Sequence, residues 1–295
     1  MKRKYNKKKN SSGFISASPL PSENELQKFY ADSYYQLSIS ATYQESYSDQ
    51  EINYKNLKCD ALLHAIKSNN CIKNNLFLDI GSGEGFLLNS AFDKGYDVTG
   101  IDFSSYGIEK FFPKLLKRHI SGDLFKSIDN LINKGLKYDV CTATNLLEHV
   151  IDPVLLLKLL KKLINKNGLI AITVPNDFSQ IQQLALKNKM IDDEFWFIPP
   201  QHLHYFNTEN LEEFIIKNGF KIVDAFSGFP IDLFLLHSKS NYIKNKKNGH
   251  EANMVRMMHD LMIVDKYGIE KYLNYYRAMF NIGIGRDITI IIQQK

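Results

Sequence analysis

The amino-acid sequence predicts an α/β protein built on a mostly parallel sheet with helices on both faces. Apolar segments of strand length alternate with helical segments between residues 76 and 226. This alternation is typical of parallel sheets. In LFLDIGSGEGF, residues 76–86, an apolar segment is followed by three glycines at alternate positions. A glycine-rich first turn is typical of folds that bind a nucleotide-like ligand at the carboxyl edge of the sheet.

The bulk composition is that of a folded protein. The chain has 295 residues, of which 44% are hydrophobic and 23% charged. No apolar run reaches the roughly 18 residues of a membrane span, and the N-terminus has no apolar secretory segment. The three cysteines, Cys59, Cys71 and Cys141, include no C-x-x-C pair and fit reduced, buried thiols. We therefore expect a cytoplasmic protein with no membrane span.

The basic charge is concentrated at the N-terminus. The net charge is +5, and subtracting the six lysines and arginines of MKRKYNKKK leaves −1. We predict a flexible basic tail over residues 1–12, because such tails are usually solvated. A nucleic-acid partner is not expected, although an arm that touches RNA or a membrane is the alternative.

The predicted elements follow one another along the chain in a regular order. Residues 13–67 form a helical cap rich in tyrosine, which lines a pocket or simply packs on the core. The core comprises residues 68–229, with strands at 76–80, 96–102, 118–121, 137–144, 169–175 and 220–226 and helices at 84–94, 105–117, 152–168 and 208–218. Asp152 caps the third of these helices, Pro153 occupies its first turn and Gly168 ends it.

Two further segments interrupt this core. Residues 175–206 form an irregular connection, which at this length indicates a lid or a binding loop. Residues 230–280 form a helical insertion whose methionines indicate packing against the core or a partner. Residues 281–295 complete the sheet as a terminal strand with no helix after it.

Acidic residues at the glycine turn restrict its ligand. Asp79 and Glu84 flank a G-x-G-x-G sequence, in contrast to the G-x-G-x-x-G of dinucleotide sites, and no Gly-Lys-Ser/Thr follows. Like charges about 4 Å apart repel by roughly 1 kcal/mol in water and by about 4 kcal/mol near a protein surface. Two carboxylates here disfavour a pyrophosphate and favour a cationic ligand without phosphate.

Five motifs follow one another along the chain: LDIGSGEG, GIDFS, SGDLF, NLLEHVIDP and GLIAITVPN. Through these motifs the chain resembles the class I S-adenosylmethionine-dependent methyltransferases. The resemblance implies a Rossmann-like fold of seven strands with an antiparallel last strand. It implies S-adenosyl-L-methionine as cofactor, with Asp102 at the ribose, Phe103 along the adenine and Asp123 at the adenine amino group. The full set of implied cofactor residues is Asp79, Gly81, Gly83, Gly85, Asp102, Phe103, Asp123, Leu124 and Asn145.

Two histidines are candidates for the proton transfer that methylation of a hydroxyl requires. His202 in PPQHLHYF matches a histidine of the acceptor pocket in similar sugar methyltransferases, and His149 follows the fourth strand. Each can instead be a histidine that hydrogen-bonds the backbone. Some relatives in the ubiquinone pathway bind a divalent metal through Glu-x-x-Glu-His, but here Asn145 replaces the first acid. Glu148 and His149 alone are a poor site for a hard cation, so we expect no metal.

The acceptor is indicated only by the general layout of the chain. A tyrosine-rich leader and Gly-x-Gly-Arg near the C-terminus resemble methyltransferases of bacterial surface-glycan pathways. The resemblance implies O-methylation of a sugar, nucleotide-linked or in a glycan. The candidate acceptor residues are Tyr34, Tyr35, Tyr43, Trp196, Tyr205 and Arg286. Arg286 either holds an acceptor phosphate or forms a salt bridge at a strand end. Methylation of nitrogen, carbon or phosphate, a scaffold without catalysis, and a homo-oligomer stay open.

Overall fold

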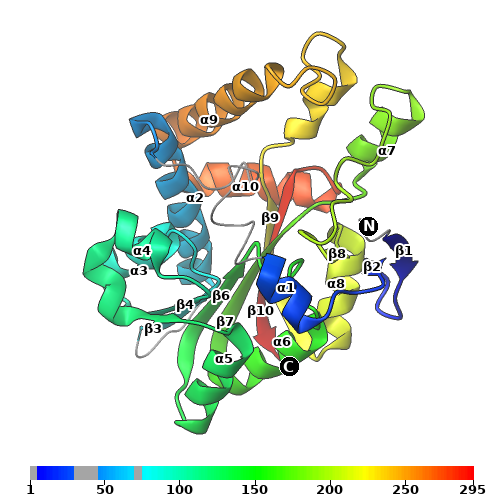
Figure 1. Ribbon diagram of the computed structural model, residues 1–295. Coiled ribbons are helices and arrows are strands. Elements are labelled where there is room, and N and C mark those ends of the chain that lie inside the picture. The colour runs from blue at the N-terminus through cyan, green and yellow to red at the C-terminus, as the bar shows by residue number, and fades with distance from the viewer. Residues whose placement is uncertain (1–4, 30–45, 70–74) are drawn as a thin grey trace.

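The computed structural model of the protein describes residues 5–29, 46–69 and 75–295. It contains two sheets (Figure 1), a central one of seven strands and a small one of three. The central strands, in chain order, are β3 (Leu76–Ile80), β4 (Asp97–Asp102), β5 (His119–Ser121), β6 (Tyr138–Thr144), β7 (Ile164–Pro175), β9 (Phe220–Ser227) and β10 (Asp287–Gln294).

The central sheet has the predicted topology. Its strand order is β5-β4-β3-β6-β7-β10-β9. The first five of these strands are parallel to one another, whereas β10 is antiparallel to both of its neighbours. The chain builds the sheet outward from β3 in both directions, with β4 and β5 on one side and β6 and β7 on the other. The loops after these strands therefore lie at the switch point where α/β sheets bind ligands.

Helices cover both faces of this sheet (Figure 1). One face packs against α5 (Leu124–Asn133), α6 (Pro153–Leu163) and α8 (Thr208–Lys217). The other face packs against α2 (Asp49–Ser68), α3 (Phe86–Asp93), α4 (Tyr106–Phe111) and α10 (Ile269–Asn281). In β3, Leu78 and Ile80 contribute to the first core and Phe77 to the second. This follows from the alternation of side chains along a strand.

One predicted helix ends earlier than expected. Asp152 caps α6 by accepting a hydrogen bond from the Leu155 amide at 2.9 Å, and Pro153 occupies the first turn, as predicted. The helix stops at Leu163, however, and β7 begins at Ile164. Ile164 pairs with β6 and is buried, so sheet pairing prevails over the helical pattern that ran on to Gly168.

The prediction of a flexible tail was wrong for residues 6–9. These residues form β1 (Asn6–Lys9), which pairs with β2 (Ile15–Ser18), and β2 pairs with β8 (His204–Tyr205). The lysines of β1 are exposed, so their charge does not oppose the pairing. Lys7 also forms an ion pair with Glu194 at 2.6 Å. The predicted cap contains β2 as well as α1 (Glu23–Phe29) and α2, while Tyr34, Tyr35 and Tyr43 lie outside the described residues.

The connection and the insertion are both more ordered than their sequences suggested. Residues 175–206 contain α7 (Gln180–Lys187), and Trp196 packs with Ile191 and Leu235 in a small satellite core. The insertion consists of a 3-10 turn (Ile231–Leu236), α9 (Asn248–Tyr267) and α10. Among its methionines, Met257 is buried, whereas Met258 and Met262 are exposed. A second 3-10 turn (Pro113–Arg118) follows α4. Among the described residues, no helix combines the length and apolarity needed to cross a bilayer.

Candidate active site

The glycine turn after β3 has the backbone conformation that requires glycine. Gly81, Gly83 and Gly85 have φ angles of 75°, 52° and 85°. The Gly83 amide donates a 2.9 Å hydrogen bond to Oδ2 of Asp102, and the Gly81 amide donates to the Ile101 carbonyl at 2.8 Å. The turn is therefore fixed to the end of β4, and its left-handed residues tolerate a side chain poorly.

A fourth glycine supports this turn and was not identified from the sequence. A Cβ atom added to Gly107 would lie 2.5 Å from the Gly83 carbonyl oxygen and 2.8 Å from the Glu84 Cα. Gly107 thus allows α4 to lie directly against the turn. Only its position three residues after the GIDFS motif could have indicated this, because its contact is made in the tertiary structure.

A first cavity of about 400 Å³ opens at the carboxyl ends of β3, β4 and β6. Half-exposed Phe103 forms one wall, and Asp123 caps α5 by accepting a hydrogen bond from the Lys126 amide at 2.9 Å. The predicted cofactor residues that line this cavity are Gly81, Asp102, Phe103, Asp123, Leu124 and Asn145. Residues from four separate motifs therefore meet around one space.

A second cavity, of about 480 Å³, lies beside the first and shares Asn145 with it. Of the predicted cofactor residues, it is also lined by Asp79 and Gly85. Helices α2 and α9 contribute Tyr54, Lys58, Asn253 and Arg256, and the sheet contributes the hydroxyl side chains of Thr144, Thr173, Ser227 and Thr289. Its lining combines apolar side chains with hydroxyl groups and charges of both signs.

The two acids of the turn differ in their surroundings. Glu84 forms an ion pair with Lys55 at 2.9 Å and accepts a hydrogen bond from the Tyr47 hydroxyl at 2.6 Å. Asp79 is buried, and within the described part of the chain its carboxyl accepts a hydrogen bond from the uncharged Thr142 hydroxyl at 2.7 Å. Burial raises the pKa of Asp79 to about 7. The expectation that both acids act as free charges is therefore wrong for Glu84, whose charge Lys55 compensates, and Asp79 is the acid that a cation would ionise.

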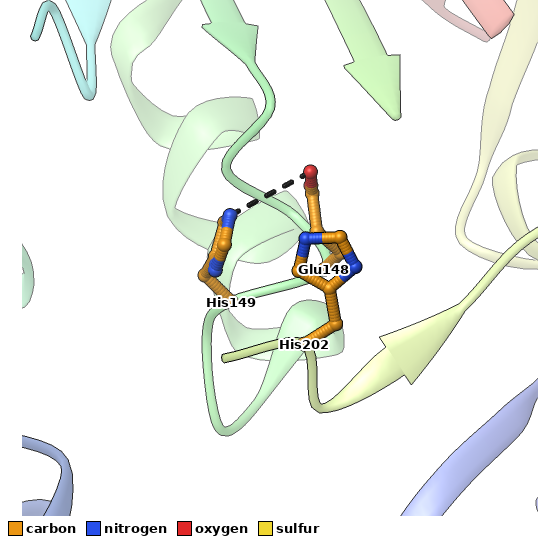
Figure 2. Close-up of side chains that lie close together, drawn as sticks. All are labelled: Glu148, His149 and His202. Atoms are coloured by element: carbon orange, nitrogen blue, oxygen red, sulfur yellow. Dashed lines mark ion pairs between the residues drawn. The ribbon is translucent and has the colours of Figure 1, made fainter. Parts of the chain in front are cut away.

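The two predicted histidines lie together with Glu148 (Figure 2). The ring centroids of His149 and His202 are 4.9 Å apart, and Nε2 of His149 lies 3.7 Å from Oε1 of Glu148. The Nδ1 atom of His149 donates to the Gln201 carbonyl at 2.6 Å, which leaves Nε2 to face Glu148. His149 also lines the first cavity, whereas His202 lines neither of the two cavities, so this histidine–glutamate cluster adjoins the first cavity through His149.

Glu148 and His149 carry little charge near neutral pH. Glu148 is 1% exposed, and neither of its carboxylate oxygens has a hydrogen-bond partner within residues 5–29, 46–69 and 75–295. Burial raises the pKa of Glu148 to about 8 and lowers the pKa of His149 to about 3. Both groups are therefore mainly neutral at pH 7.

A buried ion pair lies next to His202. Nη1 of Arg286 donates to Oδ1 of Asp177 at 2.8 Å, and Oδ2 of Asp177 lies 3.9 Å from Nδ1 of His202. Arg286 was predicted to hold an acceptor phosphate, but the structure places it against Asp177 and it lines neither of the cavities described above. Asp177 in turn faces His202, an arrangement that can orient a histidine base.

The structure brings a third possible metal ligand, His202, to the two that the sequence suggested. Glu148, His149 and His202 can each offer a ligand atom, and these atoms lie within 4.8 Å of one another. The sequence suggested only the first two as ligands. The donor set of two imidazoles and one carboxylate could hold a transition metal but is poor for magnesium.

Two of the predicted aromatic acceptor residues, Trp196 and Tyr205, pack in the interior. Trp196 is 1% exposed in the satellite core, and Tyr205 is equally buried. The Tyr205 hydroxyl donates to the His202 carbonyl at 2.8 Å and accepts from the Ile198 amide at 3.1 Å, which holds the segment that carries His202. His204 is a histidine in a polar packing site, since Ser16 and the Ile151 carbonyl contact its two ring nitrogens.

The sequence profile described as a methyltransferase domain matches residues 52–225, more than half of the chain. The chain belongs to the class I S-adenosylmethionine-dependent methyltransferases. The match begins within α2, includes the glycine turn and strands β3 to β7, and ends within β9, before the helical insertion.

The curated relatives match this chain at low identity and over only part of its length. The ubiquinone biosynthesis O-methyltransferase of Pelagibacter ubique is 35% identical over 107 residues, which cover 36% of this chain and 44% of that protein. The enzyme of the same name from Colwellia psychrerythraea is 25% identical over 169 residues, which cover 55% and 68%. The chain spans about half the length of the first curated relatives it matches, 47% and 44%.

A solved structure supports the fold. The plantazolicin methyltransferase BpumL, in complex with a monoazolic desmethylPZN analog and SAH, superposes with a TM-score of 0.52. It is 15% identical, and the superposition covers 92% of this chain and 94% of that one. At this identity the likeness concerns the architecture.

The described residues fit S-adenosylmethionine on the chemistry of the site. Asp102 lies at the end of β4, where its carboxylate can accept from ribose hydroxyls, and Phe103 offers an apolar face to the adenine. Asp79, with its raised pKa, is suited to an ammonium or sulfonium. Gly83, which lines neither cavity, instead fixes the turn through Asp102.

Proposed function

We propose that this protein transfers the methyl group of S-adenosylmethionine to a hydroxyl group of a small polar acceptor, a sugar or a sugar nucleotide. One observation carries the proposal. The histidine–glutamate cluster adjoins the predicted adenosine cavity through His149, and the His202 ring lies 4.9 Å from that of His149, which supports a proton acceptor near the cofactor.

The sulfonium of the bound cofactor supplies an already activated methyl group. The work left to the chain is alignment of donor and acceptor, exclusion of water and removal of the hydroxyl proton. The glycine turn and Asp102 hold the nucleoside, and Asn145 lies where the two cavities meet.

His202 is the proposed base. Its side chain is 12% exposed, and Asp177 lies 3.9 Å from Nδ1, so a proton on Nδ1 would point to Asp177 and leave Nε2 to accept the hydroxyl proton. The imidazolium that forms would face the Asp177 carboxylate, which stabilises it. Arg286 keeps Asp177 in place through their 2.8 Å ion pair.

The proposal does not need a metal. Protonated Glu148 and neutral His149 form an uncharged pair, which requires no cation to compensate it. His149 is held by its hydrogen bond to the Gln201 carbonyl, and its ring packs edge-on against His202, so it supports His202 by packing.

The second cavity supports a polar acceptor. It is lined by Thr144, Thr173 and Thr289 at the sheet and by charged side chains of α2 and α9. Hydroxyl and charged groups of this kind suit a ligand with many hydrogen-bonding groups. The matched relatives that are named O-methyltransferases favour oxygen as the methylated atom. A place in surface-glycan synthesis, a cytoplasmic location and the absence of a nucleic-acid partner stay predictions of the sequence.

Calorimetry with S-adenosylhomocysteine, followed by a radiolabel transfer assay over sugars, sugar nucleotides and matched amines, tests the proposal. We expect binding of the nucleoside product and transfer to a hydroxyl-bearing acceptor. Transfer only to amines would exclude a hydroxyl acceptor. Binding without transfer to any compound would favour a scaffold.

Replacing Gly107 with alanine should weaken S-adenosylhomocysteine binding by about tenfold or more. The added methyl would overlap the backbone of Gly83 and Glu84, so the turn must shift away from the cofactor. Gly249→Ala, on α9, is the matched control because nothing lies within 4 Å of its added Cβ. Equal affinities in calorimetry for the two variants would show that α4 does not determine the position of the turn.

Asp79 should make cofactor binding depend on pH. With a pKa of about 7, its carboxyl is mainly neutral at pH 6 and ionised at pH 8, so affinity for S-adenosylmethionine should rise over this interval by roughly tenfold. In Asp79→Asn the rise in affinity should disappear.

The raised pKa of Asp79 also means that the folded state loses stability as pH rises from about 4 to about 7. Asp79→Asn should therefore have a higher Tm than the wild type at pH 8, and a lower Tm there would contradict the assignment.

A further inference from the structure

A cation from the insertion faces the second cavity. Arg256 lies on α9 and lines this space together with Lys58 of α2 and Asn253 of α9. The methyltransferase-domain match ends at residue 225, so α9 lies outside the part of the chain that the family profile covers. The insertion therefore contributes Arg256 to a cavity whose other walls come largely from the part of the chain that the family profile matches.

The two lysines that line the same cavity already have carboxylate partners. Lys55 forms an ion pair with Glu84 at 2.9 Å, and Lys58 forms one with Asp287 at 3.3 Å. No carboxylate of the described residues forms an ion pair with Arg256. Its Nη2 atom donates to the side-chain oxygen of Asn253, and its buried Nε atom has no hydrogen-bond partner among the described residues. The guanidinium thus keeps unused donors beside the cavity.

The position of Arg256 is fixed by a buried tyrosine cluster. Its guanidinium carbon lies 5.3 Å from the centroid of the Tyr54 ring. The Tyr54 hydroxyl donates to Asp260 at 3.2 Å, and Asp260 also accepts from Tyr272 and Tyr276. These contacts join α2, α9 and α10, so the arginine is held against a rigid surface and little entropy is lost when it binds a ligand.

We propose that Arg256 binds an anionic group, a carboxylate or a phosphate, of the acceptor in the second cavity. The proposal rests on the proposed function and specifies the acceptor class. A guanidinium with free donors matches the planar or tetrahedral oxygens of such groups and can bind them through paired hydrogen bonds. The sequence suggested Arg286 for this role, but Arg286 is engaged with Asp177, whereas Arg256 lines the cavity.

The acids of the cavity limit the ligand to a localised anion. Glu84 and Asp287 are compensated by lysines, the Glu51 carboxylate accepts hydrogen bonds from Ser48 in the cap of α2, and Asp79 lies at the cofactor end. An anionic group is therefore favoured at the α9 end, while the rest of the acceptor meets hydroxyl side chains at the sheet.

The test is a ³¹P NMR titration in which inorganic phosphate is the probe. The protein is the full chain, saturated with S-adenosylhomocysteine. We expect saturable phosphate binding in the wild type, a loss of about tenfold or more in Arg256→Met, and partial retention in Arg256→Lys. Lys266→Met, an exposed cation on the same helix, is the control and should bind phosphate as the wild type does. Absence of saturable binding in the wild type, or equal binding in Arg256→Met, would overturn the proposal.

A second arm separates the acceptor from the carboxylate of the cofactor. Affinity for S-adenosylhomocysteine should be the same in wild type and Arg256→Met, and transfer to a sugar 1-phosphate should decline more than transfer to the free sugar. Loss of S-adenosylhomocysteine affinity in Arg256→Met would assign the arginine to the cofactor and overturn the acceptor role. Failure of the wild type to bind S-adenosylhomocysteine at all would instead refute the proposed function.

Discussion

Replacing His202 with alanine should lower kcat by about 100- to 10,000-fold, the contribution typical of a positioned general base. Affinity for S-adenosylhomocysteine should stay the same, because His202 does not line the first cavity, whereas His149 does. The measurement is steady-state methyl transfer to the acceptor found in the screen, with calorimetry of the cofactor product in parallel. His149→Ala should differ by lowering both turnover and affinity.

Two controls make this result specific. His237→Ala removes an exposed histidine and should leave kcat unchanged. Treatment with EDTA followed by metal-free buffer should also leave kcat unchanged if His202 acts as a base. A loss of activity on chelation, restored by zinc or manganese, would show instead that Glu148, His149 and His202 hold a metal. Full activity of His202→Ala would exclude its role as the base.

Asp102→Ala should raise the Kd for S-adenosylhomocysteine by at least about 100-fold. The variant removes the predicted ribose acceptor and also the oxygen that holds the Gly83 amide at 2.9 Å, so the ligand contact and the turn are lost together. A hydrogen bond to a charged group contributes about 1.5 to 3 kcal/mol, and tenfold in affinity corresponds to about 1.4 kcal/mol. Calorimetry measures the change directly.

The control for this variant lies on the same strand. Asp97→Ala removes an exposed carboxylate at the start of β4, paired with Arg118 at the surface, and should leave the Kd unchanged. Asp102→Asn should fall between the two, since its amide oxygen can still accept one hydrogen bond. A Kd for Asp102→Ala within threefold of the wild type would refute the assignment of the first cavity to the nucleoside.

Local signals were sufficient for most of the sheet. The short apolar segments, each followed by a turn and a helix, predicted the parallel strands, and Asp152 with Pro153 predicted where α6 begins. The end of α6 and the strand β1 were not predictable in this way. Ile164 and Asn6 leave the expected conformation because a partner strand pairs with them, and β8, which completes the small sheet, lies about 200 residues further along the chain from β1.

The sequence by itself determined the fold class, the glycine turn and which residues meet around the first cavity. The physical reason is that Gly81, Asp102 and Asp123 each follow a strand of one parallel sheet, so their order along the chain places them at one edge. Only the tertiary structure decided the acceptor side. His202 reaches Glu148 and His149 from a distant segment, Lys55 compensates Glu84 from α2, and Arg256 enters from α9. Such contacts depend on how helices outside the sheet pack, which no local pattern encodes.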